Sequence, residues 1–175
     1  MAILGVDDFK ARLQGGGVRP NLFQATINFP GYAEGDVNET SFMCKAAALP
    51  ASQVGVIEVP FRGRVLKVGG DRTFDPWTVT VINDTDFVVR DSFERWMNGI
   101  NAHKANTGLV DPVEYEADLV VEQLDKDGST LKKYDFRGCW PSNVSEIEVS
   151  WDTNDTIEEY TVEFQVQYWE AVTTS

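Results

Sequence analysis

The sequence contains few side chains that could act as nucleophiles. Its two cysteines, Cys44 and Cys139, are far apart in the chain and show no CxxC or Cys/His spacing. The single histidine, His103, lies in the polar stretch 101–106, which we interpret as a solvated connection between elements. A catalytic serine or cysteine needs a base within hydrogen-bond reach. We therefore expect two buried free thiols and no catalytic residue, which argues against an enzyme.

Motifs for metals and phosphates are also weak. Asp125-Lys126-Asp127-Gly128 resembles the start of a calcium loop, but its glycine comes two positions too early and the bidentate glutamate is missing. We interpret this motif as a hairpin turn. The glycines at 15–17 lack the lysine and hydroxyl of a phosphate-binding loop. The sequence therefore predicts no metal and no cofactor.

Acidic side chains dominate the charge of the protein. The chain has 28 Asp and Glu against 15 Lys and Arg, a formal charge of −13 at pH 7. Such a surface is not built to hold nucleic acid by neutralising phosphates. In the C-terminal part, five glutamates are predicted to share one sheet face, which is either solvated or lines an acidic cavity. They are Glu146, Glu148, Glu158, Glu159 and Glu163.

The length of 175 residues predicts a single domain over 1–175, because no linker, repeat or low-complexity tract divides the chain. The N-terminal residues lack the basic start and the apolar run of a signal peptide, and no stretch approaches the length of a membrane span. We expect a protein without membrane anchoring, with reduced cysteines in an intracellular assembly compartment.

The N-terminal half is predicted to begin with a helical segment, 1–18, in which Val6, Phe9 and Leu13 share one face. The glycines at 15–17 end this helix. Hydrophobic residues then alternate with a period of two, which predicts strands over 23–29, 41–48 and 73–83. An acidic loop, 32–40, connects the first two strands.

Residues 54–68 can form strands but contain too few large apolar residues to anchor a core of their own. We predict an extended hairpin arm, 54–59 and 61–68, interrupted at Pro60. Such an arm either packs on its own domain or reaches a neighbour. Two arginines, Arg62 and Arg64, lie in the arm, and the Gly69-Gly70 turn follows it.

One long helix and two further hairpins complete the predicted fold. The helix is capped by Asp84 or Thr85 and carries an apolar stripe of Val89, Phe93, Trp96, Met97 and Ile100. One hairpin pairs 114–122 with 131–139, and a final hairpin pairs 147–151 with 160–168. The fold class is mainly β (α+β): an antiparallel β-sandwich or barrel with one flanking α-helix and the extended hairpin arm.

Several short motifs occur in an order that resembles one known family. They are Arg19-Pro20-Asn21-Leu22-Phe23, Cys44-Lys45-Ala46-Ala47-Ala48-Leu49-Pro50, Gly70-Asp71-Arg72-Thr73-Phe74-Asp75, Trp77-Thr78-Val79-Thr80-Val81, Trp140-Pro141-Ser142-Asn143-Val144 and Tyr168-Trp169-Glu170. Together they resemble the tail tube family of T4-like contractile phages. The resemblance covers nearly the whole chain, and the sequence departs from it around 32–38 and after Glu170.

The resemblance implies a sandwich-like β domain shared with type VI secretion tube proteins. It implies rings of six copies whose strands merge into one inner barrel, stacked inside a contractile sheath. The implied partners are further copies of this chain, the tail sheath protein, the baseplate hub and the tail terminator proteins. It also implies assembly in the host cytoplasm, a place in the virion, and DNA that passes through the tube without specific binding.

For the contacts between copies we predict that the arm crosses to a neighbour, where Arg62 and Arg64 meet carboxylates. Asp71 and Arg72 then hold the base of the arm, or they form only a salt bridge within the chain that fixes the turn. The residues predicted between subunits are Val56, Phe61, Arg62, Arg64, Asp71 and Arg72. Closing sheet edges against identical neighbours would protect them from irregular association.

Two other functions fit the sequence less well. One is the inner tube of an injection or type VI-like secretion particle, which carries proteins instead of DNA. The other is a carbohydrate-binding β-sandwich module, which exposed aromatic side chains would indicate. The candidates are Trp77, Trp96, Trp140, Trp151 and Trp169, of which four lie in patterned positions or beside a proline and are predicted to be buried.

Overall fold

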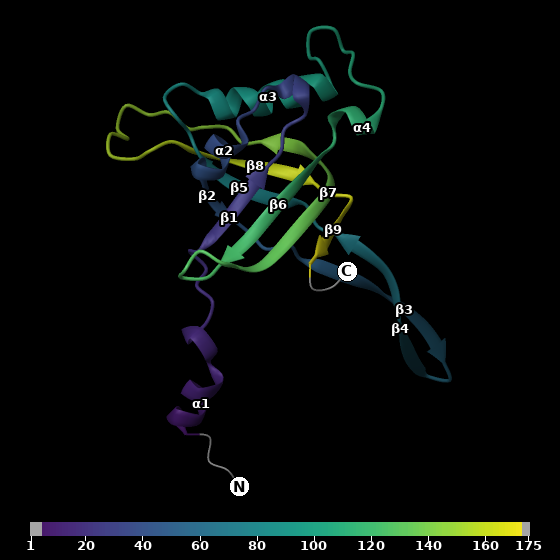
Figure 1. Cartoon of the computed structure of the whole chain (residues 1–175). Helices are drawn as coiled ribbons and strands as arrows, with labels where there is room; N and C mark the ends of the chain where they lie inside the picture. Colours follow the sequence, from purple (N-terminus) through teal and green to yellow (C-terminus); the bar gives the residue numbers. More distant parts are fainter. Residues whose placement is uncertain (1–4, 173–175) are drawn as a thin grey trace.

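A seven-stranded antiparallel sheet forms the main body of the protein (Figure 1). The computed structural model describes residues 5–172. The strand order is β1-β6-β7-β8-β5-β2, and β9 pairs with β7. The strands are β1 (Phe23–Ile27), β2 (Cys44–Ala47), β5 (Trp77–Ile82), β6 (Ala117–Leu124), β7 (Thr130–Val144), β8 (Glu159–Gln165) and β9 (Tyr168–Ala171). The mainly β prediction is confirmed, although the sheet does not close into a barrel within the described chain, where β1 and β2 each pair on one side only.

The core lies between this sheet and helix α3 (Val88–Ile100), which crosses one side of the sheet (Figure 1). Alternating residues of the strands, such as Val79 and Val162, are fully buried. The rings of Phe93 and Trp96 lie 6.0 Å and 5.9 Å from that of Phe164. The indole of Trp96 also donates a 2.7 Å hydrogen bond to the carbonyl of Tyr115. Val89, Phe93 and Trp96 of the predicted stripe are confirmed as core, and Ile100 packs against it, whereas Met97 is only half-buried.

Helix α3 begins later than its predicted caps, Asp84 and Thr85. Asn83 still follows β5 and donates its backbone N–H to the carbonyl of Glu158 over 2.9 Å. The chain then turns, and Phe87 takes the N-cap position with a φ of 56°. Because Asn83 stays with the sheet, the residues after it are needed for the turn and cannot start the helix.

A short helix, α2 (Val37–Met43), replaces the first part of the strand predicted over 41–48. The carboxylate of Asp36 caps it by accepting hydrogen bonds from the backbone N–H groups of Asn38 (2.8 Å) and Glu39 (3.2 Å). This local cap outweighs the strand pattern, so that only Cys44–Ala47 remains as β2. The last residues of the predicted acidic loop, 37–40, therefore form the first part of helix α2.

The final hairpin predicted over 147–151 and 160–168 is wrong. Strand β7 does not end at residue 139, where the predicted return strand ended, but continues to Val144, with an irregular register between Pro141 and Asn143. It therefore pairs with β8 where the predicted partner would lie. Residues 147–151 form part of a loop, and Trp151 is fully exposed, contrary to its predicted burial. The predicted strand 73–83 is also interrupted, between Phe74 and Trp77.

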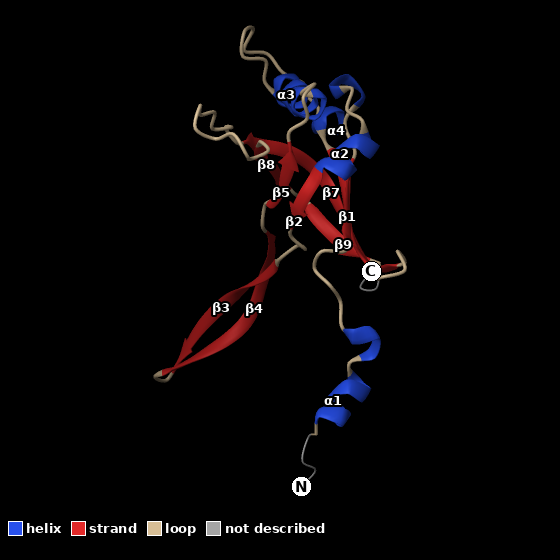
Figure 2. Cartoon of the chain, turned by 90° about the vertical axis from the view of Figure 1, so that its left-hand side faces the viewer, coloured by secondary structure: helices blue, strands red, loops and turns tan. Residues whose placement is uncertain are grey.

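Two elements extend away from the sheet on the side opposite α3 (Figures 1 and 2). One is helix α1 (Val6–Arg12), joined to β1 through the short 3-10 turn η1 (Gln14–Gly16). The other is the hairpin of β3 (Ser52–Phe61) and β4 (Arg64–Phe74). Of the predicted segment 1–18, residues 1–4 lie outside the described part.

Smaller elements complete the structure. The 3-10 turn η2 (Gly31–Ala33) packs on α3, where Arg95 donates to the carbonyl of Ala33 over 3.0 Å. The one-turn helix α4 (Pro112–Tyr115) leads into β6. In the described residues no helix has the length and apolar character that a membrane crossing requires.

Candidate assembly surfaces

The arm turns at Arg62 and Gly63, which both have positive φ angles of 45° and 79°. A two-residue hairpin turn with both residues in this region matches the right-handed twist of its strands. Pro60, the predicted break, lies inside β3 opposite Val65 instead. A proline is tolerated there because β3 is an edge strand.

The arm has one apolar face and one mixed face. Residues paired across a hairpin share a face, and the pairs Ile57–Val68, Val59–Leu66 and Phe61–Arg64 alternate with Pro60–Val65 and Glu58–Lys67. The first face carries five large apolar side chains, while the second carries an ion pair with 4.0 Å between the Lys67 amine and the Glu58 carboxylate.

The apolar face of the arm is not covered by any part of the chain between residues 5 and 172. Its five apolar side chains are 45–66% exposed: Ile57, Val59, Phe61, Leu66 and Val68. Val56, on the other face, is equally open. A two-stranded hairpin with no covering layer is only marginally stable in water. An exposed apolar surface of this kind indicates a protein–protein contact.

The base of the arm is fixed to the body by residues of β4 and β9. The Arg72 guanidinium donates to the Ser52 hydroxyl over 2.9 Å and lies 5.5 Å from the Trp169 ring centre. Trp169 donates its indole N–H to the carbonyl of Ala51 over 3.2 Å. Asp71 precedes Arg72 with an exposed side chain. The sequence did not single out Trp169 for this position, since nothing local links it to β4.

The structure separates the predicted residues of the arm into two groups. Phe61, Arg62 and Arg64 lie together at the tip, where the Arg62 guanidinium is 5.4 Å from the Phe61 ring centre. Asp71 and Arg72 lie at the base. The tip is positively charged and free to reach another molecule, whereas the base is already engaged with its own chain.

Helix α1 presents a second uncovered apolar stripe. Val6, Phe9 and Leu13 follow each other at helical spacing and are 72%, 65% and 44% exposed. Asp7 and Asp8 lie in its first turn and Lys10 and Arg12 in its last, as the helix dipole favours. The sequence predicted the stripe but gave it no role. The three glycines after the helix could have indicated that its stripe is exposed, because they separate the helix from the body.

Four of the predicted glutamates come together at the loop between β7 and β8. Glu146, Glu148, Glu158 and Glu159 line a hollow of about 520 Å³ together with Ile147 and other loop residues. Glu163 lies elsewhere, in β8, where it accepts a hydrogen bond from Ser142. Glu159, at the start of β8, pairs with Lys45.

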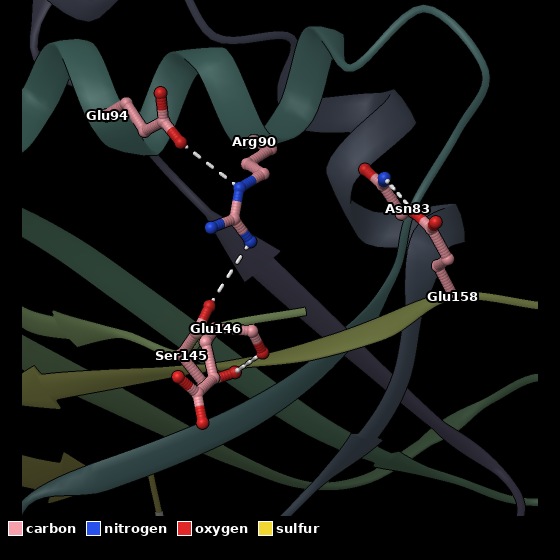
Figure 3. Close-up of polar contacts among 6 residues, drawn as sticks. All are labelled: Asn83, Arg90, Glu94, Ser145, Glu146 and Glu158. Atoms are coloured by element: carbon pink, nitrogen blue, oxygen red, sulfur yellow. Dashed lines mark hydrogen bonds and ion pairs between the residues drawn. The ribbon is translucent and has the colours of Figure 1, made fainter. Parts of the chain in front are cut away.

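The ends of this loop are held by α3 and by the residue that follows β5 (Figure 3). Arg90 donates to the Ser145 carbonyl over 3.2 Å and to the Glu94 carboxylate over 3.1 Å. The Asn83 amide donates to the Glu158 carboxylate over 3.0 Å. The loop between β7 and β8 is therefore anchored at both ends, while its middle, including Trp151, is open to solvent.

Neither cysteine is an activated nucleophile. Cys44 and Cys139 are free and buried, as predicted. Burial raises the pKa of the Cys44 thiol to about 11 and that of the Cys139 thiol to about 12, so both are protonated at neutral pH. His103 is exposed in the loop after α3. No group of three potential metal ligands occurs in the described residues.

Comparison with known proteins places the chain in a family. Residues 8–172 match the family model for phage tail tube proteins. The tail tube protein of Enterobacteria phage T4 is 41% identical over 169 residues, which cover 94% of this chain and 99% of that protein. The chain belongs to the phage tail tube protein family. The tail tube protein of Serratia phage KSP90 is 33% identical over 95% of this chain and 96% of its own length.

Solved structures show the same tail tube fold in more distant proteins. A chain from the sheath–tube complex of the extracellular contractile injection system PVC, in its extended state, has a TM-score of 0.66 at 12% identity. The match covers 95% of this chain and 97% of that one. A chain from the tube-terminating cap of the anti-feeding prophage also has a TM-score of 0.66, with 14% identity and 89% and 90% coverage. These likenesses concern the fold alone.

Proposed function

We propose that this protein is the structural subunit of the tail tube of a contractile-tailed bacteriophage. The observation that carries this proposal is the 41% identity to the phage T4 tail tube protein over almost the full length of both chains. The uncovered arm and α1 support it, because a chain that exposes two apolar elements is suited to ordered contact with identical copies.

In this assembly six copies form a ring, and rings stack into a tube inside the contractile sheath. The open ends of the sheet, β1 and β2, are the edges that neighbours would pair with or cover. Head-to-tail contacts between neighbours would close into a ring around one axis. A second set of contacts, between stacked rings, would extend the assembly along that axis. The tail sheath, baseplate hub and tail terminator proteins are the further partners that we propose.

The conduit is passive toward DNA. Each copy carries a formal charge of −13, and a lining of carboxylates repels phosphates instead of binding them. Glu146, Glu148, Glu158 and Glu163 are the residues that we propose for an acidic surface of the tube. The protonated thiols and the exposed single histidine support a role without catalysis.

Electron microscopy of the purified full-length chain tests this function directly. Concentrated protein should form rings or hollow rods of uniform width, and these should not retain linear duplex DNA in a filter-binding assay at physiological salt. A persistent monomer that binds glycans would favour a carbohydrate-binding module and contradict the proposal. Saturable DNA binding by the rods would contradict the passive conduit alone.

The arm is the proposed contact between copies, through Val56, Phe61, Arg62 and Arg64, with Asp71 and Arg72 at its base. The variant with Arg62→Glu and Arg64→Glu should remain folded, because both side chains are exposed. It should form fewer or no rods, since both charges at the tip are reversed. Normal rod formation by this variant would remove the arm tip from the interface.

A further inference from the structure

We infer that the apolar face of the arm in one copy packs against helix α1 of a neighbouring copy. The inference deepens the proposed tube function, since it assumes that copies of this chain assemble. It rests on the presence of two exposed apolar surfaces in one molecule, which lie apart and do not contact each other within that molecule.

The two surfaces match in character. The arm offers the stripe of Ile57, Val59, Phe61, Leu66 and Val68, and the helix offers Val6, Phe9 and Leu13, all at least 44% exposed. Each is a single layer without a partner: the arm has two strands, and α1 is seven residues long. Neither is expected to hold its shape in water alone. A helix laid on a hairpin gives each of them the second layer that a stable unit needs.

The placement of the two elements requires a second copy. Both extend on the side opposite α3, and they lie apart in both views (Figures 1 and 2). The base of the arm is held to β9 through Arg72 and Trp169, so the arm does not swing freely toward its own helix. Helix α1, in contrast, is joined to the body through three consecutive glycines with positive φ, Gly15, Gly16 and Gly17. The helix is the element that adapts to the partner.

The charges give the contact a direction. The tip of the arm carries Arg62 and Arg64, and the first turn of α1 carries Asp7 and Asp8. Asp8 accepts a hydrogen bond from the backbone N–H of Gly5 over 3.2 Å, so Asp7 is the carboxylate of this turn without that local contact. With the first turn of α1 toward the arm tip, opposite charges flank the apolar contact and reject the reversed orientation.

Cysteine crosslinking in assembled protein tests this contact. The double variant with Phe9→Cys and Val59→Cys should form a ladder of covalent multimers when assembled protein is oxidised. A mixture of the two single variants should stop at dimers, because each chain then carries one new thiol. The wild-type chain supplies the background, which should be low because Cys44 and Cys139 are buried.

Matched controls use the opposite faces of the same elements. Pairing Phe9→Cys with Glu58→Cys places the arm thiol on the mixed face, and pairing Ala11→Cys with Val59→Cys moves the helix thiol to the side of α1 opposite the apolar stripe. Both should crosslink at least about tenfold less. Equal crosslinking of all pairs, or none for the first pair in normal rods, would overturn the inference. Absence of rods in the wild-type protein would instead refute the proposed tube function.

A charge-exchange cycle provides a second measurement that needs no cysteine. Asp7→Lys and Arg62→Glu should each raise the protein concentration required for assembly about fivefold. The combined variant should recover part of this loss, because the opposite charges then face each other again. If the combined variant raises the concentration required for assembly by the product of the two single effects, the two residues do not interact. This result would reject the proposed direction of the contact.

Discussion

The body and the arm are built from the same kind of sequence but end in opposite environments. In β5 and β8, alternating apolar residues such as Val79 and Val162 are fully buried beneath α3. In β3 and β4, Ile57, Val59 and Phe61 also alternate with other residues, and so do Leu66 and Val68. Nevertheless Val59 and Leu66 remain 45% and 61% exposed. Period-two patterning therefore specifies a strand with an apolar face. It does not specify whether the cover comes from the same chain or from another one.

The apolar residues of the two regions therefore have different roles. Those of the body stabilise the single folded chain, and those of the arm and α1 are available for assembly. The division suits a tube subunit, because it separates the residues that hold the body together from those that are exposed for contact with other copies. It also predicts that stability and assembly can be altered separately by mutation.

The largest expected effect is on the body. Phe93→Ala removes a fully buried ring between α3 and the sheet, and the cavity should cost about 3–5 kcal/mol of unfolding free energy. Urea unfolding of the unassembled chain measures this loss. Phe61→Ala, in the exposed arm tip, is the matched control and should change stability by no more than about 0.5 kcal/mol. Similar losses for both variants would show that the arm is part of the folded core.

The second effect is on assembly. Val59→Ser combined with Leu66→Ser makes the apolar face of the arm polar, and the concentration required for rod formation should rise about a hundredfold, or about 2.7 kcal/mol. Sedimentation of the assembled protein measures this concentration. Unfolding of the single chain should be almost unchanged.

The control for this variant uses the other face of the arm. Glu58→Ser combined with Lys67→Ser removes an exposed ion pair, which contributes little energy. Assembly should therefore stay near the wild-type level. A stronger defect here than for the apolar face would mean that charge, and not apolar burial, drives the contact of the arm.

A third expected effect is alkaline destabilisation of the body. Burial raises the pKa of Cys139 from 9.0 to about 12, so the thiol stays protonated in the folded chain while it ionises in the unfolded chain. Stability from this group is fully present below about pH 9 and is lost as the pH rises toward 12. Each such thiol should lower the unfolding free energy by up to about 1.4 kcal/mol per pH unit in this window.

Urea unfolding at pH 8, 9 and 10 checks this slope, because tyrosines contribute mainly above that range. The Cys139→Ala variant should lose a substantial part of the slope, and the remainder should belong to Cys44, whose pKa is raised to about 11. A slope that is identical in the variant would mean that the Cys139 thiol is not buried in solution.

The sequence predicted much of the body and less of the surfaces. The stripe of α3, the turn at 125–128 and the buried cysteines follow from local spacing, and all are confirmed. The predicted hairpin over 147–151 failed because β7 continues past Pro141 and takes its place beside β8. That outcome depends on competition between distant segments, which local pattern does not contain.

The arm illustrates the same limit at a functional surface. The arm was predicted because residues 54–68 can form strands but contain too few large apolar residues for a core. Its break was placed at Pro60, however, whereas the turn lies at Arg62-Gly63. The reason is that the cross-strand register, with Phe61 opposite Arg64, decides the turn. The anchoring of its base by Trp169 was not predictable, because that contact joins residues far apart in the chain.

This anchor supplies the smallest expected effect and links the two regions. Trp169→Ala removes the hydrogen bond to Ala51 and the ring that contacts Arg72, so about 1 kcal/mol of the stability at the arm base should be lost. Backbone N–H groups of β3 near Ser52 should then exchange hydrogen faster, and the assembly concentration should rise a few-fold. Trp151 is fully exposed in the loop between β7 and β8, so Trp151→Ala should leave hydrogen exchange in the arm unchanged. If both variants behave alike, the arm is not oriented from its base, and α1 of a neighbour would have to position it after assembly begins.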